Sequence, residues 1–199
     1  MKINFPLLAL ALAIGAFAIG TTEFSPMGLL PNIAHDLNIG IPTVGMLITG
    51  YALGVMLGAP VMTLWLGHIS RRKALIFLMM LFTIGNLMAA IAPNYWSLMA
   101  ARLITSLNHG AFFGIGSVVA ASVVPAHKQA SAVASMFMGL TIANIGGVPL
   151  ATWLGQTIGW RTAFFAISAL GVITMWSLFK ALPQGSTGRR PDIKAEIKV

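Results

Sequence analysis

Six long apolar stretches alternate with short polar breaks along the chain. Each stretch has the ~20 mainly apolar residues that a helix needs to cross the hydrocarbon core of a bilayer. Backbone exposed to lipid must hydrogen-bond within its own segment, which predicts helices, whereas a barrel would need shorter alternating segments. We therefore predict an all-α membrane protein with spans at Phe5–Leu30, Pro42–Leu66, Ala74–Ile91, Trp96–Val119, Ser131–Leu154 and Ala163–Leu182.

The composition excludes a soluble globular domain. Of the 199 residues, 57% are hydrophobic and 8% are charged, whereas soluble domains are about one quarter charged. The net charge is +8, but the cations gather at the ends of apolar stretches, which is typical of membrane topology and not of a nucleic-acid surface. The expected environment is a lipid bilayer, with no nucleic-acid partner.

Lysine and arginine fall almost entirely on one side if the spans alternate in direction. The other side receives only Arg161, and Arg102 lies within a span. Because cytoplasmic loops carry the excess of Lys and Arg, both termini are predicted to be cytoplasmic. The cations on the predicted cytoplasmic side are Lys2, Arg71, Arg72, Lys73, Lys128, Lys180, Arg189, Arg190, Lys194 and Lys198.

The N-terminal stretch does not have the pattern of a cleaved signal peptide, and the C-terminal residues do not have the pattern of a span. The first apolar stretch continues to Leu30, which is too long for the hydrophobic region of a cleaved signal. Residues 1–182 are predicted to form one transmembrane bundle. Residues 183–199 change to Gly, Pro and charge, and are expected to be a cytoplasmic linker or a truncated tail.

Two spans share a weak sequence echo. Gly58–Gly67 in the second span and Gly147–Gly155 in the fifth both contain Gly, Pro, Thr, Trp and Gly in that order. These are the second helices of successive three-helix units, so the echo predicts a 3+3 inverted repeat, as in many secondary transporters. Chance similarity between Gly-rich helices is the alternative.

Small residues recur at four-residue spacing on two spans. Gly50, Gly54 and Gly58 share one face of the second span, and Gly110 and Gly114 share one face of the fourth. Such faces let membrane helices approach closely. Tight packing explains them, and helices that rock during transport would use the same pattern.

Two charges lie inside spans, Glu23 in the first and Arg102 in the fourth. Intramembrane charges should face protein or a wet cavity. At ~1.5 Å rise per residue, both lie about 10 Å below the same interface, so they could meet if their helices are neighbours. Glu23 is then either a proton carrier or half of a fixed ion pair. His109, nearly two turns along, is a candidate proton relay or a packing histidine.

Further polar groups lie within the spans. Asn86, Asn108 and Asn144 are of the kind that hold helices together, and Asn108 and Asn144, with Phe112, are candidates for lining a substrate cavity. Pro149 follows two glycines and should bend the fifth span. The loop histidines are predicted to be solvated, without metal-ligand partners: His35, His68 and His127.

No enzyme motif is present. The chain lacks a Gly-rich phosphate loop ending in Lys-Ser/Thr, an HExxH helix and a GxSxG turn. We therefore predict no enzymatic activity, no cofactor and no metal site.

Three segments carry a family resemblance: Gly20–Pro31, Leu107–Gly114 and Gly139–Pro149. With them, and with Gly159-Trp160-Arg161, the chain resembles the N-terminal half of major facilitator superfamily transporters, in the bacterial drug- and sugar-efflux, arabinose-efflux-permease-like branch. The resemblance implies exchange of small molecules such as drugs or sugars for protons across the bacterial inner membrane. It also implies a cavity lined by spans one, two, four and five, and a complementary C-terminal six-helix half.

Motifs carry over only in part. The basic end of the gating motif after the second span is kept as Arg71-Arg72-Lys73, but Gly67 stands where the family has an aspartate. Arg102 matches the arginine that the family associates with proton coupling, and Ser106 replaces its usual glycine. The antiporter-like motif of the fifth span is matched at Gly146, Gly147, Pro149 and Gly155.

A non-transporting membrane protein, either a remnant or a helical partner, is the alternative function. A channel is disfavoured because no re-entrant, filter-like loop separates the spans. The isolated half is expected not to transport.

Overall fold

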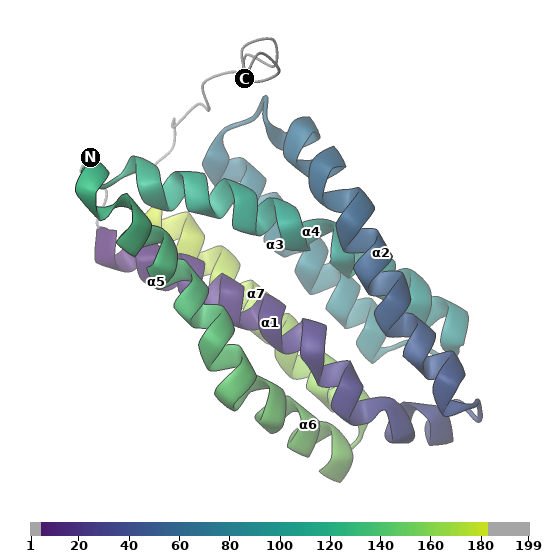
Figure 1. Cartoon of the computed structure of the whole chain (residues 1–199). Coiled ribbons are helices and arrows are strands. Elements are labelled where there is room, and N and C mark those ends of the chain that lie inside the picture. Colours follow the sequence, from purple (N-terminus) through teal and green to yellow (C-terminus); the bar gives the residue numbers. More distant parts are fainter. Residues whose placement is uncertain (1–4, 183–199) are drawn as a thin grey trace.

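The computed structural model describes residues 5–182, and the predicted tail at 183–199 lies outside the described residues. The described part is helical throughout (Figure 1). Its elements are α1 (Phe5–Asp36), α2 (Ile41–Leu66), α3 (Arg71–Ala90), α4 (Tyr95–Ser122), the 3₁₀ turn η1 (Ala126–Lys128), α5 (Gln129–Ile142), the π-helical η2 (Ala143–Gly147), α6 (Val148–Thr157) and α7 (Trp160–Ala181).

Six helical stretches in the described range are long and apolar enough to cross a membrane. Five are single helices, and the fifth along the chain, Ala126–Thr157, joins η1, α5, η2 and α6. The six-span, all-α prediction is therefore confirmed.

Helix α1 is longer than predicted. It passes through Pro31 and ends at Asp36, although proline removes a backbone N–H and usually stops a helix before it. The extra turn buries Ile33 completely and leaves Ala34 only 6% exposed. Burial of these two side chains offsets the hydrogen bond lost at Pro31.

The extension of α1 is held by the start of α7. The Trp160 Nε1–H donates to Asp36 Oδ2 at 3.1 Å, and the Arg161 guanidinium donates to the same oxygen. Arg161 Nη2 also donates to the Ala92 carbonyl at 2.9 Å. One arginine thus ties together the ends of α1, α3 and α7 on the face of the bundle where these helices meet.

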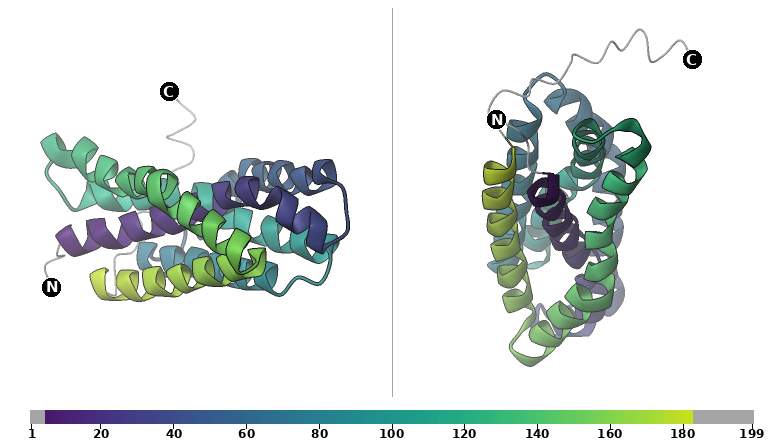
Figure 2. Two further views of the ribbon diagram at one scale, coloured as in Figure 1. Left: turned by 90° about the horizontal axis from the view of Figure 1, so that it is seen from below. Right: turned by 90° about the vertical axis from the view of Figure 1, so that its left-hand side faces the viewer.

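The first three spans and the last three make equivalent helix–helix contacts. Helix α1 lies between α5–α6 and α7, and α4 contacts α2, α3 and α5 (Figure 2). Exchanging the first three spans with the last three maps the α2–α4 contact onto the α5–α1 contact, and α3–α4 onto α7–α1. This correspondence agrees with the predicted 3+3 inverted repeat.

The glycine faces mark the α2–α4 contact. A Cβ added to Gly58 would lie 2.8 Å from Leu107 Cδ2, and one added to Gly110 would lie 2.3 Å from the Cβ of Ala59. Nothing lies within 4 Å of a Cβ at Gly114. The packing face on α4 therefore uses Gly110 but not Gly114.

Two spans are much less buried than the others. In α2 and in the fifth span, 22% of the most apolar window is buried, against 44–56% in the other four spans. Both present wide apolar faces that lipid or another polypeptide must cover. On α2 the exposed large apolar residues are Ile41, Met46, Leu53, Met56, Leu57, Val61, Leu64 and Trp65.

Candidate functional site

A polar cluster lies inside the bundle where the first four helices meet. It brings together three residues predicted from sequence, Glu23, Arg102 and His109, with three others. The full set is Thr22 and Glu23 on α1, Tyr51 on α2, Asn86 on α3, and Arg102 and His109 on α4.

Arg102 is the largest fully buried side chain of the described residues, at 1% exposed. Its Nη1 donates to the Thr22 carbonyl at 3.0 Å and to the Thr22 hydroxyl at 3.2 Å. Its guanidinium carbon lies 4.1 Å from the centroid of the Tyr51 ring. The buried charge is therefore stabilised by dipoles and by a cation–π contact.

Thr22 is in turn supported by α3. Its hydroxyl donates to Asn86 Oδ1 at 2.6 Å, and Asn86 Nδ2 donates to the Phe82 carbonyl at 2.9 Å. Both Thr22 and Asn86 are fully buried. Asn86 therefore joins α3 to α1, as expected of a helix-bridging amide, and holds the threonine that receives Arg102.

Glu23 faces His109. The Glu23 Oε2 lies 3.8 Å from His109 Nε2, and the two side chains are 28% and 15% exposed. The other ring nitrogen, His109 Nδ1, is 3.1 Å from the Tyr51 hydroxyl. A path of polar contacts thus runs from a partly accessible carboxylate, through imidazole and phenol, to the buried guanidinium of Arg102.

The two predicted intramembrane charges therefore lie in one cluster but meet through other residues. Among the described residues, Arg161 forms an ion pair with Asp36, and Glu23 approaches His109, which is charged only when protonated; a direct contact between Glu23 and Arg102 is absent there. Tyr51 contacts both Arg102 and His109 and so links the two parts of the cluster. The sequence did carry a signal for it, since Tyr51 is a polar aromatic inside a span and a buried Tyr hydroxyl needs a partner.

Aromatic rings border the accessible side of His109. Phe113 lies 5.3 Å from the His109 ring and stacks on Phe137 of α5 at 5.1 Å, measured between centroids. Phe112, the residue predicted to line a cavity, is fully buried and points at Gly15 of α1. Phe112 therefore packs in the bundle core, and its neighbour Phe113 is the ring beside the cluster.

The two cavity-candidate asparagines lie in different surroundings. Asn108 is fully buried, with Nδ2 3.3 Å from the Leu78 carbonyl and no partner for Oδ1 among residues 5–182. Asn144 is exposed in η2 and donates to the Leu140 carbonyl at 3.0 Å. Asn144 can thus face a cavity completed by another polypeptide, whereas Asn108 bonds within the bundle.

The antiporter-like motif begins in the π-helical segment, with Gly146 and Gly147, and continues into α6 with Pro149 and Gly155. Gly147 closely approaches Phe17 and Thr21 of α1, whereas a Cβ at Gly146 would meet nothing within 4 Å. Pro149 stands in the first turn of α6. The predicted irregularity of the fifth span is therefore a π turn at Ala143–Gly147 that separates α5 from α6.

The loop motif lies at the start of α3. Ser70 caps this helix by accepting from the Lys73 N–H at 3.5 Å, which lets the helix begin at Arg71, three residues before the predicted Ala74. Arg72 is 9% exposed, and its guanidinium carbon lies 4.3 Å from the Phe179 ring centroid. A gating role for this motif stays a prediction.

Histidines and acids of the described residues form no metal-binding group of three or more. His35, His68 and His127 are exposed, as predicted, but His35 lies in the last turn of α1 and His127 in η1 rather than in loops.

Known proteins resemble the chain over its full length. It is 69% identical over 199 residues to the inner membrane transport protein YdhP of Escherichia coli (strain K12), covering 100% of this chain and 51% of that protein. It is 40% identical over 189 residues to AraJ of the same organism, covering 95% of this chain and 46% of that one. A chloramphenicol resistance protein of Streptomyces lividans is 33% identical over 180 residues, covering 90% and 46%. The chain thus spans about half the length of the relatives it matches.

Solved structures share the fold. The proton:xylose symporter XylE superposes with a TM-score of 0.79 at 14% identity, over 90% of this chain and 45% of that one. The profile of the Major Facilitator Superfamily matches residues 12–198. Packing, span number and sequence thus agree, and the chain belongs to the Major Facilitator Superfamily, where it corresponds to the N-terminal half of a transporter.

Proposed function

We propose that this chain contributes the N-terminal half of a proton-coupled efflux transporter of the bacterial inner membrane, with Glu23 as the proton-carrying group. The single observation that carries the proposal is the 3.8 Å approach of the Glu23 carboxylate to His109. Glu23 is the only acidic residue in the interior of a described span, because Asp36 ends α1.

The chemistry of the cluster supports this assignment. Arg102 is fully buried and arginine does not release its proton in proteins, so it serves as a fixed positive charge. Glu23 and His109 are partly accessible, and both side chains can gain and lose a proton. Protonation of Glu23 removes the negative charge that partly balances the fixed charge of Arg102. The net charge of the cluster therefore differs between the protonated and deprotonated steps of a transport cycle.

Substrate identity and direction rest on the relatives. The Streptomyces lividans relative is named for chloramphenicol resistance, which favours export of small molecules. A substrate would bind between the two halves, as in transporters built from repeats. The aromatic pair Phe113 and Phe137, beside His109, supplies an apolar wall on this chain's side. The start of α1 and the end of α7 would face the cytoplasm, on the side that carries most of the Lys and Arg.

The test joins this chain to the C-terminal half of Escherichia coli YdhP in one membrane. Chloramphenicol export driven by an imposed proton gradient is compared in wild type, Glu23→Gln and Asp36→Asn at matched expression. Glu23→Gln should abolish gradient-driven export while substrate still binds. Asp36→Asn, the same acid-to-amide change outside the cluster, should retain it. Gradient-driven export by Glu23→Gln at the wild-type rate and pH dependence would refute the assignment.

A further inference from the structure

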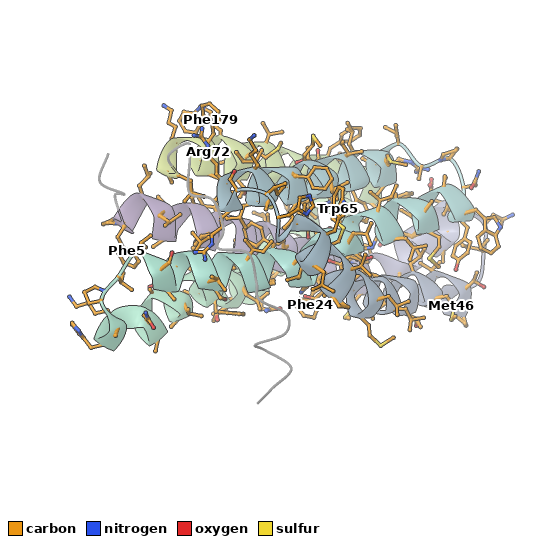
Figure 3. The ribbon with its side chains drawn as sticks, turned by 90° about the horizontal axis from the view of Figure 1, so that it is seen from above. Phe5, Phe24, Met46, Trp65, Arg72 and Phe179 are labelled. Carbon is orange, nitrogen blue, oxygen red and sulfur yellow. The ribbon has the colours of Figure 1, made fainter. Side chains whose placement is uncertain are left out.

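A group of cations lies at the end of the bundle where α3 begins and α7 ends. We define the α3–α7 cationic end as Arg71, Arg72, Lys73 and Lys180. Two of its members rest on aromatic rings of α7: Arg72 on Phe179 at 4.3 Å and Lys180 on Trp176 at 4.1 Å. Figure 3 shows Arg72 and Phe179 side by side at one edge of the molecule.

These cations have no acidic partner within the described residues. Glu23 and Asp36 are the only acids between residues 5 and 182, and they pair with His109 and Arg161 respectively. Arg72 is 9% exposed, and its guanidinium stacks on the Phe179 ring rather than on an acidic group of the described residues. The positive charge of this largely buried guanidinium is therefore not neutralised by a carboxylate of the described residues.

The surroundings indicate where that ligand would come from. Trp176 and Phe179 are 60% and 58% exposed on an apolar side of α7. In membrane proteins tryptophan is enriched at the level of the lipid headgroups. The first N–H groups of α3 add positive partial charge at the same place. Arg72 stacks on Phe179, three residues after Trp176, so its guanidinium is expected near the headgroup level.

We propose that the α3–α7 cationic end is a binding site for the phosphodiester of an anionic glycerophospholipid. The planar guanidinium of Arg72 matches phosphate oxygens with two parallel donors. Lys180 and Lys73 add charge, and Phe179 and Trp176 contact the glycerol and upper acyl region. The site is independent of the polar cluster around Glu23 and does not rest on the proposed transport activity.

The experiment titrates the detergent-purified chain with phosphatidylglycerol or phosphatidylcholine of identical acyl chains and measures bound lipid by native mass spectrometry. The wild type should bind phosphatidylglycerol preferentially. Arg72→Gln should bind it about fivefold more weakly, as for the loss of one cation beside an anionic headgroup. Lys128→Gln is the matched control, because it removes the same charge from the connection before α5, and it should bind like wild type.

Two further arms keep the outcome decisive. Phe179→Leu retains every charge and an apolar side chain but removes the ring under Arg72, so weaker binding supports the site even if Arg72→Gln fails to fold. Inorganic phosphate at equal concentration should not displace the lipid. Equal binding of both lipids, equal losses in Arg72→Gln and Lys128→Gln, wild-type binding by Phe179→Leu, or displacement by inorganic phosphate would each overturn the proposal.

Discussion

Gly54 on α2 and Ser106 on α4 lie so close that a Cβ on Gly54 would be 2.1 Å from the Ser106 Oγ. The Ser106 hydroxyl donates to the Leu103 carbonyl at 2.7 Å, which fixes its direction. Ser106 stands where the family usually has glycine. The close approach of α2 and α4 at this point requires a small residue, and Gly54 of α2 provides it.

This contact makes a reciprocal prediction. Gly54→Ala should destabilise the bundle by ~1–3 kcal/mol, the usual cost of overpacking, and adding Ser106→Gly should restore most of the loss. Thermal unfolding of the purified variants measures both effects. Gly45→Ala is the control, because nothing lies within 4 Å of a Cβ there. An undiminished loss in the double variant would contradict the proposed contact.

The hydrogen bond between Thr22 and Asn86 predicts non-additive substitutions. Asn86→Leu leaves the buried Thr22 hydroxyl without its acceptor, at a cost of ~1–3 kcal/mol. Thr22→Val together with Asn86→Leu should cost less than the sum of the single changes, with a coupling of ~0.5–3 kcal/mol. Denaturant unfolding of the four proteins in the cycle tests this. Strict additivity would mean that the two side chains act separately.

The Asp36–Arg161 pair predicts a second coupling at the far end of the bundle. Asp36 and Arg161 are 44% and 35% exposed, so the charge interaction alone should contribute only ~0.2–1 kcal/mol and weaken with salt. Arg161→Gln should cost more than Asp36→Asn, because it also removes the donor to the Ala92 carbonyl. Unfolding at low and high salt separates the two contributions. Equal losses in both variants would argue against the Ala92 contact.

The proposed orientation predicts the side of every loop. Reporter fusions at Ser70 and Lys128 should be active in the cytoplasm, and fusions at Asn38, Asn94 and Thr157 in the periplasm. The physical reason is the concentration of Lys and Arg on the first set of loops. A single fusion on the opposite side would refute the assigned order of spans.

Span number and the general place of the charged residues could be predicted from the sequence, because hydrophobic length and helical rise determine both. Depth alone placed Glu23 and Arg102 at similar heights. Their partners could not be predicted, since these depend on how far each helix rotates about its axis. That rotation places Tyr51 over Arg102 and directs Glu23 toward His109.

Helix ends were less predictable for a related reason. A proline rule places the end of α1 before Pro31, but contacts with Trp160 and Arg161, more than 120 residues later in sequence, hold the last turn in place. Similarly, Phe112 and Phe113 are indistinguishable by composition. Only the packing of α1 against α4 determines that Phe112 is buried and Phe113 lies beside His109.

The π turn at Ala143–Gly147 gives the fifth span one residue more than a regular helix of the same length would hold. If the extra residue of the π turn moved by one position along the span, the side chain at that position would rotate about the helix axis by about 100°. The ends of the span, Gln129 and Thr157, would stay in place. The span can therefore change which side chains it offers to α1 without changing its length. At Gly146 an added Cβ would meet nothing within 4 Å, so this position leaves room for such a shift.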